Sequence, residues 1–297
     1  MIHIIGHKKE RERLRWARER NCVAQSYIFF GPQGIGKSLC ALEFSCALVG
    51  EPFFTPSDDQ PTPLDVLVMR PREEEKRGVI KVKNIAAEDV REALRFLSCY
   101  PASGKYRVVI IEEAHKLSLS AQNVLLKTLE EPNPSAVIIL VTHEKGTLGE
   151  TILSRTQNMR FDFVSEEEMM ATIDQNGQDI APFFFSLGRP GMIFRALHFP
   201  QEFIREKEAL TRLFKLSSLP LVERMKLAEE LGKNIPQAVR LLEWWLPGLH
   251  AQALRDTDTW RTARFFVLLE LTETTLRLLK TTQANGRLLL EKLFFSV

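Results

Sequence analysis

The distribution of apolar residues in the first half of the chain predicts short strands separated by helices. Apolar runs of branched and aromatic residues, typical of buried strands, lie at 27–30, 65–69, 107–111 and 136–141. Apolar residues at helical spacing occupy 8–20, 39–49, 87–97 and a segment that begins at Ser118 or Ser120 and ends before Pro132. Strands that alternate with helices in this way predict a doubly wound parallel sheet.

Two segments of the first half lack a regular pattern. Residues 51–64 contain four prolines and three acids, which excludes a regular element. Residues 71–78, PREEEKRG, are a run of charges, and we interpret them as a solvated loop.

The pattern changes at Val164. Ser165 and Glu168 fit a capping box, and helical periodicity follows, interrupted by Gly177, by 188–191 and by Pro200. From residue 201 onward the chain is leucine-rich and helical in pattern. The predicted domains are therefore an α/β domain at 1–163, a small helical domain at 164–200 and an all-helical domain at 201–297.

Composition is that of a folded chain of two or three domains. The protein has 297 residues, with 44% hydrophobic and 26% charged residues. The net charge of +2 is too small for bulk electrostatics to attract nucleic acid or membrane. The start is too charged for a secretory signal and no segment has the apolar length of a membrane span, so we expect a soluble cytoplasmic protein with no membrane contact.

The cysteines indicate neither a redox dithiol nor a zinc site. Cys22, Cys40, Cys46 and Cys99 form no C-x-x-C pair, and we expect four free thiols, mostly packed as small apolar groups.

A glycine-rich segment between the first predicted strand and the next helix has the spacing of a phosphate-binding loop. Its residues are Gly31, Pro32, Gln33, Gly34, Ile35, Gly36, Lys37 and Ser38, which fit G-x-x-x-x-G-K-[ST]. The glycines let backbone N–H groups surround a phosphate, the lysine neutralises outer phosphates, and the serine supplies a magnesium ligand. We call residues 31–38 the phosphate loop. An ordinary glycine turn with a surface lysine is the alternative.

Two acids, Glu112 and Glu113, follow the predicted strand 107–111. Hydrolysis of a bound nucleotide needs a carboxylate near magnesium and one that activates water. We place Glu112 at the metal and Glu113 at the water. Because adjacent strand residues point to opposite faces, a turn must reorient one of them. The alternative is two acids that merely end a strand in solvent.

Three further segments resemble a known family. They are VVIIEEAHKL (108–117), NVLLKTLEEPNP (123–134) and TILSRT (151–156). With the phosphate loop, they resemble the clamp-loader branch of the AAA+ ATPases. The combination of LLKTLEEP with LSR is far more specific than the phosphate loop. Residues 285–293, NGRLLLEKL, are similar to the closing helix of the family's collar domain, so the resemblance covers the whole chain.

The resemblance implies an architecture, cofactors and partners. The architecture is an AAA+ core at 1–163, a helical lid at 164–200 and a collar at 201–297 that joins five subunits in a ring. The implied cofactors are ATP and Mg²⁺. The implied partners are gamma/tau-type and delta-type subunits of the bacterial DNA polymerase III clamp loader, the sliding clamp and primer–template DNA. In that family the assembly uses ATP to place the clamp on DNA during replication.

The same resemblance assigns two further residues. Arg155 would be an arginine finger for the ATP site of the adjacent subunit, where a guanidinium stabilises charge on the phosphoryl oxygens. Thr142 would be a sensor that hydrogen-bonds the terminal phosphate or its water. A surface ion pair for Arg155 and a plain strand-end threonine are the alternatives.

The sequence departs from the family pattern at several positions. Glu112 stands where the family usually has Asp, and Thr156 replaces the cysteine of the S-R-C motif. In the lid, a glycine aligns with the usual second-sensor arginine, and neither Arg189 nor Arg195 is in clear register. Many relatives contain a four-cysteine zinc module, but 47–98 has no cysteine, and we predict no zinc although Cys46 could match its first ligand.

These departures favour a stator-type subunit that binds ATP but hydrolyses it weakly or not at all alone. A gamma-type motor subunit and a nucleotide-dead structural component of the ring are the alternatives. A P-loop GTPase or metabolic kinase is disfavoured, because a GTPase needs an N-K-x-D motif, which is absent, and neither explains the helical C-terminal third. The basic residues of 8–20 could contact DNA phosphates, but interleaved glutamates favour a solvated helix, and we assign no DNA-binding residue.

Overall fold

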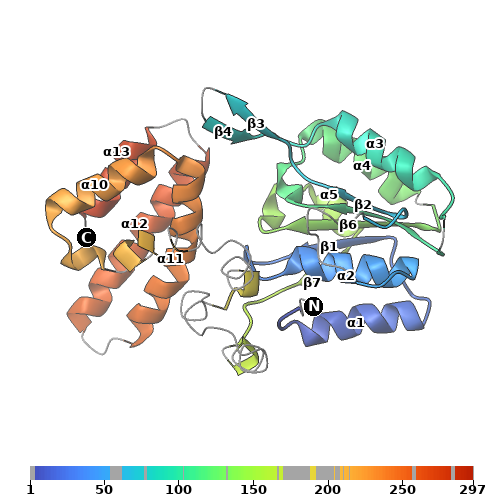
Figure 1. Ribbon diagram of the computed structural model, residues 1–297, viewed down its shortest axis with the longest axis horizontal. Coiled ribbons are helices and arrows are strands. Elements are labelled where there is room, and N and C mark those ends of the chain that lie inside the picture. The colour runs from blue at the N-terminus through green and yellow to red at the C-terminus, as the bar shows by residue number, and fades with distance from the viewer. Residues whose placement is uncertain are drawn as a thin grey trace. The chain divides into compact units, whose positions relative to one another are not determined.

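The computed structural model divides into two compact units, each with its own hydrophobic interior (Figure 1). Unit 1 comprises Met1–Ile180 with Gly188–Gly191, and unit 2 comprises Ala181–Leu187 with Met192–Val297. The structure describes residues 4–53, 62–76, 79–102, 104–131, 133–165, 167–169, 188–191, 204, 208–209, 211–213, 215–255, 259–281 and 285–296.

Unit 1 is built on a five-stranded parallel sheet, which confirms the predicted α/β class. The strand order is β2-β5-β6-β1-β7. The bounds are β1 Ser26–Phe30, β2 Val66–Met69, β5 Arg107–Ile111, β6 Ala136–Thr142 and β7 Gln157–Arg160. Strand β7, with the sequence QNMR, buries only Met159. A strand with so little apolar content gives no pattern from which it could be predicted.

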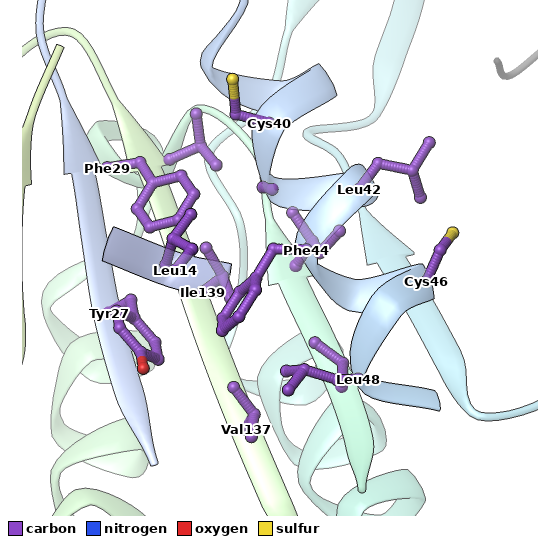
Figure 2. Close-up of a cluster of buried hydrophobic side chains, with 14 of the residues drawn as sticks. Leu14, Tyr27, Phe29, Cys40, Leu42, Phe44, Cys46, Leu48, Val137 and Ile139 are labelled. Atoms are coloured by element: carbon purple, nitrogen blue, oxygen red, sulfur yellow. The ribbon is translucent and has the colours of Figure 1, made fainter. Parts of the chain in front are cut away.

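Alternation along the strands separates two hydrophobic clusters, one on each face of the sheet. On β1, Tyr27 and Phe29 belong to one cluster and Ile28 to the other. Figure 2 shows Tyr27 and Phe29 beside Leu14 and Phe44. Each such buried side chain contributes about 1.5–3 kcal/mol relative to exposure to water. The period-2 pattern of the strands therefore fixes which of their side chains belong to which cluster.

Helices cover both faces of the sheet (Figure 1). On one face are α1 (Lys8–Glu19) and α2 (Lys37–Val49), and on the other α3 (Ala87–Ser98), α4 (Leu119–Glu130) and α5 (Glu150–Ser154). Ser118, rather than Ser120, caps α4, because its Oγ accepts a hydrogen bond from the N–H of Ala121 at 3.2 Å.

The prediction of a solvated loop at 71–78 is wrong in part. Residues Glu73–Lys76 form β3, which pairs antiparallel with β4 (Val79–Val82) as a separate two-stranded sheet. The register sets Glu74 opposite Lys81. The β-forming residues VIKV supply the partner strand, and backbone pairing with that strand gives the charged run its extended conformation.

Every regular element described in unit 2 is helical, as the sequence predicts from residue 201 onward. The main helices are α10 (Leu221–Gly232), α11 (Ile235–Arg255), α12 (Thr259–Thr281) and α13 (Gly286–Phe295). Asn285 caps α13 by accepting hydrogen bonds from the N–H groups of Arg287 and Leu288. Leu290 and Leu293 of the same helix are buried in the core of unit 2.

Most of the predicted lid lies outside the described residues, including Gly177, Arg195 and Pro200. The domain boundaries at 163/164 and 200/201 therefore stay predictions. At the start of this segment, the N–H of Glu168 donates to Ser165 Oγ at 3.3 Å, which is one half of the predicted capping box. Among the helices of the described ranges, none is long and apolar enough to cross a bilayer.

Candidate nucleotide-binding site

The phosphate loop joins the carboxyl end of β1 to the first turn of α2. Its three glycines have positive φ angles of 146° at Gly31, 79° at Gly34 and 99° at Gly36. A Cβ on Gly31 would lie 2.0 Å from the carbonyl oxygen of Phe161, so no other residue fits there. Gly36 is the N-cap of α2 in a left-handed conformation. The glycine spacing in the sequence is therefore a requirement of this backbone path.

Two backbone carbonyl oxygens of the phosphate loop accept hydrogen bonds from residues outside it. His7 Nε2 lies 2.7 Å from the carbonyl oxygen of Ile35, and because a carbonyl only accepts, Nε2 carries the proton. The N–H of Gly191 donates to the carbonyl of Gly34 at 2.8 Å. A Cβ on Gly191 would approach that same oxygen to 2.6 Å, so a glycine is needed for the contact. Residues 188–191 thus pack directly on the phosphate loop.

Lys37 is buried beside the loop that precedes it. Its Nζ donates to the carbonyl oxygens of Gly31 at 2.8 Å and Pro32 at 2.5 Å. Burial, and secondarily the positive charge of Arg189, lowers the pKa of Lys37 to about 7. Arg189 is itself buried, with its guanidinium carbon 5.5 Å from the ring centroid of Phe163. Two cations therefore lie close together at the loop, and an anion placed there would favour the charged form of Lys37.

The loop can accept a phosphate. A Cβ on Gly36 would meet no atom within 4 Å, so there is open space beside the start of α2. The first N–H groups of a helix have no acceptor within the helix and favour an anion. Ser38 is the second residue of α2, and its hydroxyl, with the carboxylate of Glu112, offers the oxygen ligands that Mg²⁺ prefers.

Glu112 follows β5 and is engaged by a cation from the neighbouring strand. Strands β2 and β5 pair in register, with Met69 opposite Ile111, so the next residues, Arg70 and Glu112, meet at the sheet edge. Arg70 Nε lies 2.7 Å from Glu112 Oε2, and a second guanidinium nitrogen lies 3.4 Å from Oε1. Arg70 is not predicted from the sequence. An arginine directly after β2 indicates a partner for Glu112 only once β2 is known to lie beside β5.

Glu113 lies at the turn that the sequence requires after β5. It has a φ of 48°, a left-handed conformation that is uncommon for a residue other than glycine. It is the N-cap of the short 3₁₀ helix η1 (Ala114–Lys116). Its carboxylate forms an ion pair with Lys116 one turn later.

Thr142 is the last residue of β6 and is almost fully buried. It lies opposite Phe30, directly before the phosphate loop. Its Oγ1 accepts a hydrogen bond from the N–H of Glu144 at 3.0 Å and lies 3.5 Å from His115 Nδ1. The rings of His115 and His143 pack edge to face with centroids 4.1 Å apart. Polar groups therefore gather at the carboxyl ends of β1, β6 and β5.

Arg155 lies at the other end of the sheet. It follows α5 and precedes β7, and its backbone carbonyl accepts a hydrogen bond from Ser26 Oγ, at the start of β1, at 2.8 Å. The phosphate loop begins after the fifth and last residue of β1, roughly 16 Å away at about 3.3 Å per residue. The structure thus brings Glu112, Glu113 and Thr142 to the edge of their own phosphate loop, and Arg155 to the opposite edge.

The Arg155 guanidinium is at the surface of unit 1. Its side chain is 39% exposed, and one terminal nitrogen lies 3.1 Å from Glu130 Oε1, whose side chain is 53% exposed. The other terminal nitrogen donates to the carbonyl of Thr151 at 3.2 Å. Exposed ion pairs contribute about 0–1 kcal/mol, so the guanidinium can exchange Glu130 for another anion at little cost.

The cysteines are split between core and surface. Cys40 and Cys46 of α2 are buried, and Figure 2 shows both on that helix, while Cys22 and Cys99 are exposed. The expectation of four free thiols is confirmed, but only the two on α2, not most of the four, are packed as apolar groups.

Comparison with known proteins places these features in context. A family model described as "DNA polymerase III, delta subunit" matches residues 6–165. The tau subunit of DNA polymerase III from Bacillus subtilis is 32% identical over 168 residues, which cover 54% of this chain and 28% of that protein. The delta' subunit from Pseudomonas aeruginosa is 32% identical over 142 residues, covering 44% of this chain and 41% of that protein. The matches thus span less than half the length of these relatives.

One solved structure extends the likeness to both units. A gamma subunit-related DNA polymerase III protein from Thermotoga maritima has a TM-score of 0.57 at 18% identity, covering 95% of this chain and 97% of that one. At this identity the likeness concerns the fold alone.

Proposed function

Because the chain belongs to the DNA polymerase III delta subunit family and is a clamp-loader-type AAA+ subunit, we propose that it acts as the delta-prime-like stator of a cytoplasmic clamp loader. In this role it binds ATP in its phosphate loop and lends Arg155 to the ATP site of a neighbouring subunit. Its partners are gamma/tau-type and delta-type subunits in a five-membered ring, the sliding clamp and primer–template DNA.

The position of Arg155 is the observation that carries the proposal. The guanidinium is exposed and lies at the end of the sheet opposite its own phosphate loop. A cation in that position cannot serve the nucleotide of its own chain but can meet one bound at the facing edge of another subunit. An arginine supplied in this way stabilises transition-state charge and makes hydrolysis depend on assembly.

ATP binding requires exchange of contacts within the phosphate loop. Lys37 would release the carbonyl oxygens of Gly31 and Pro32 and pair with phosphate oxygens. Ser38 and Glu112 would hold Mg²⁺, which neutralises phosphate charge when it is bound. Thr142, opposite the residue that precedes the loop, is suitably placed to hydrogen-bond the terminal phosphate or its water.

The ion pairs of the two acids support weak turnover. Arg70 engages Glu112, the proposed metal ligand, and Lys116 engages Glu113, the proposed activator of water. Each carboxylate must leave a cation of its own chain before it acts. The Lys116 pair opposes activation of water and the Arg70 pair opposes metal binding, so both lower turnover, which is the behaviour expected of a stator.

Unit 2 has features of an assembly surface. Helices α10 and α13 pack against each other and leave large apolar side chains exposed: Leu221, Val222, Met225, Leu288 and Phe295. Exposed apolar groups of this size favour contact with other protein surfaces. We assign them to the collar contacts of the ring.

The experiment that tests this function is reconstitution of the loader with Arg155→Ala. The variant should assemble with gamma/tau-type and delta-type subunits as the natural chain does, as measured by gel filtration. Single-turnover hydrolysis of ATP in the adjacent subunit, at the site that Arg155 is proposed to reach, should slow by a thousandfold or more. Arg160→Ala removes an exposed arginine paired with Asp162 in the same unit and should leave the rate unchanged. Unchanged hydrolysis with Arg155→Ala would refute the finger.

A gamma-type motor subunit is the second candidate, favoured by the match to the Bacillus subtilis tau subunit. It predicts sustained ATP turnover by the purified chain, or turnover in the loader that Lys37→Ala in this chain abolishes. A stator predicts neither, so the same preparations decide between the two.

A further inference from the structure

The outward face of α1 presents cations and one aromatic ring in a single line. Lys9, Arg13, Trp16 and Arg20 follow one another at intervals of four, three and four residues, which places them on one side of the helix and its C-cap. All four are exposed, and Trp16 retains 58% of its surface. We call these four residues the α1 stripe.

The fold does not need the α1 stripe. Leu14, on another side of the helix, is buried in the cluster shown in Figure 2. Arg11 forms a two-pronged ion pair with Glu43 that ties α1 to α2. These two residues attach the helix to the sheet, so the exposed indole contributes little to the stability of unit 1.

The charge around the α1 stripe is strongly positive. Residues 8–20 contain seven Lys or Arg and three Glu, a formal charge of +4. Among the described residues, no ion pair involves Lys9, Arg13 or Arg20. The three glutamates lie at positions 10, 12 and 19, outside the α1 stripe. Glu12 and Glu19 flank the stripe on one side, because Glu12 lies three residues after Lys9 and four before Trp16, and Glu19 lies three after Trp16. The charged positions of the stripe itself are all cationic, which the sequence shows only as interleaved charges.

The spacing suits a single strand of nucleic acid. Four residues of helix advance about 6 Å, so Lys9 and Arg13, and Trp16 and Arg20, are separated along the axis by a distance comparable to one extended nucleotide. Flexible cations in line attract phosphates, and an exposed indole offers a surface on which a base can stack. The Arg20 guanidinium carbon lies 5.8 Å from the Trp16 ring centroid, close enough to serve the phosphate next to a stacked base.

We propose that the α1 stripe binds single-stranded nucleic acid, with Lys9, Arg13 and Arg20 at phosphates and Trp16 stacked on a base. The phosphates of a duplex could contact the cations, but the indole would have no base to stack on, because the bases of a duplex are already stacked on one another. An acidic protein would likewise use only the charges. The site is independent of the phosphate loop and of Arg155, so it stands or falls separately from the proposed function.

The test is binding of fluorescent oligothymidylate of about twelve nucleotides to the full chain at low salt, followed by anisotropy. Trp16→Ala should weaken binding about tenfold, and Trp16→Phe should restore most of it. Arg13→Gln should weaken binding and reduce the slope of log K against log salt by about 0.7, the value of one phosphate contact to a single strand.

A matched control lies on the same helix. Arg15→Gln makes the same change of charge at an exposed position outside the α1 stripe, and it should affect binding less than Arg13→Gln does. Retained thermal unfolding temperatures would show that these surface variants fold. The proposal would be overturned if Arg15→Gln weakened binding as much as Arg13→Gln, if Trp16→Ala had no effect, or if the full chain did not bind the oligonucleotide. It would also be overturned if duplex DNA bound with equal affinity, or if polyglutamate competed equally well with the natural chain and with Trp16→Ala.

Discussion

At the scale of single residues, each group proposed to act on nucleotide is held by another group of its own chain. Lys37 contacts two loop carbonyls, Glu112 pairs with Arg70, Glu113 with Lys116 and Arg155 with Glu130. Binding and catalysis therefore depend on how easily these partners are exchanged. The exposed pairs are the cheapest to exchange, because water already screens them.

Removal of the Arg70 guanidinium should release Glu112 for metal. We expect Arg70→Gln to lower the Mg²⁺ concentration needed for half-maximal ATP binding by severalfold, because one positive charge beside the carboxylate is lost. A magnesium titration at fixed ATP measures this. Arg72→Gln, which removes a neighbouring arginine paired with Asp89, is the matched control and should cause little change. Equal curves for the two variants would contradict the assignment of Glu112 to the metal.

Thiol chemistry should distinguish the two pairs of cysteines. Burial, with a smaller effect of Glu43, raises the pKa of Cys40 from 9.0 to about 12. At pH 8.5 an aromatic disulfide reagent should label the exposed Cys22 and Cys99 rapidly and Cys40 only after unfolding, as followed by mass spectrometry of peptides. Between pH 9 and 12 the unfolded chain loses a proton that the folded chain keeps, so the free energy of unfolding should fall with rising pH. Comparable labelling rates for Cys40 and Cys22 in the folded chain would contradict this account.

Local spacing was sufficient to predict the glycine turn between β1 and α2 at residues 31–38, because the glycines that its backbone requires lie within eight consecutive residues. Arg70 and Arg189 could not be found in the same way. Arg70 reaches Glu112 through the register of β2 with β5, and Arg189 reaches the phosphate loop from a segment more than a hundred residues later in the sequence. Contacts that depend on strand order or on a distant segment leave no local pattern.

At the scale of elements, the order of strands decides what each functional residue can reach. Glu112 follows β5 and Thr142 ends β6, at the same end of the sheet as the phosphate loop, whereas Arg155 precedes the parallel strand β7 and so lies at the opposite end. The alternation of strands and helices predicts the parallel sheet but not its order. The β3–β4 hairpin was also missed, since its first strand is a run of charges that acquires its conformation from its partner.

The closing motif of the chain has a structural explanation at this scale. Asn285 caps α13, Arg287 pairs with Glu291 one turn later at 2.7 Å, and Leu290 is buried. We expect Asn285→Ala to reduce the free energy of unfolding of unit 2 by about 1 kcal/mol, because two N–H groups lose their acceptor. Urea unfolding followed by circular dichroism measures the change. Leu288→Ala alters an exposed residue of the same helix and should cost less, and the reverse order would contradict the capping role.

At the scale of the whole molecule, two functions are assigned to different ends of unit 1. In the proposed function, the phosphate loop would bind a nucleotide of this chain, and Arg155 would act on a nucleotide of another. A substitution at one should therefore leave the other intact. Under the proposed stator role, this separation would let a subunit with weak turnover control the hydrolysis of its neighbour.

Titration of the purified full chain with Mg²⁺-ATP tests the central claim most directly. We predict saturable binding of one ATP, loss of that binding by at least a hundredfold in Lys37→Ala, and unchanged affinity in Arg155→Ala. The lysine supplies the charge that meets the outer phosphates, and removal of a hydrogen-bonded charge contact costs about 3 kcal/mol. Absence of ATP binding by the natural chain, or equal binding by Lys37→Ala, would contradict the account.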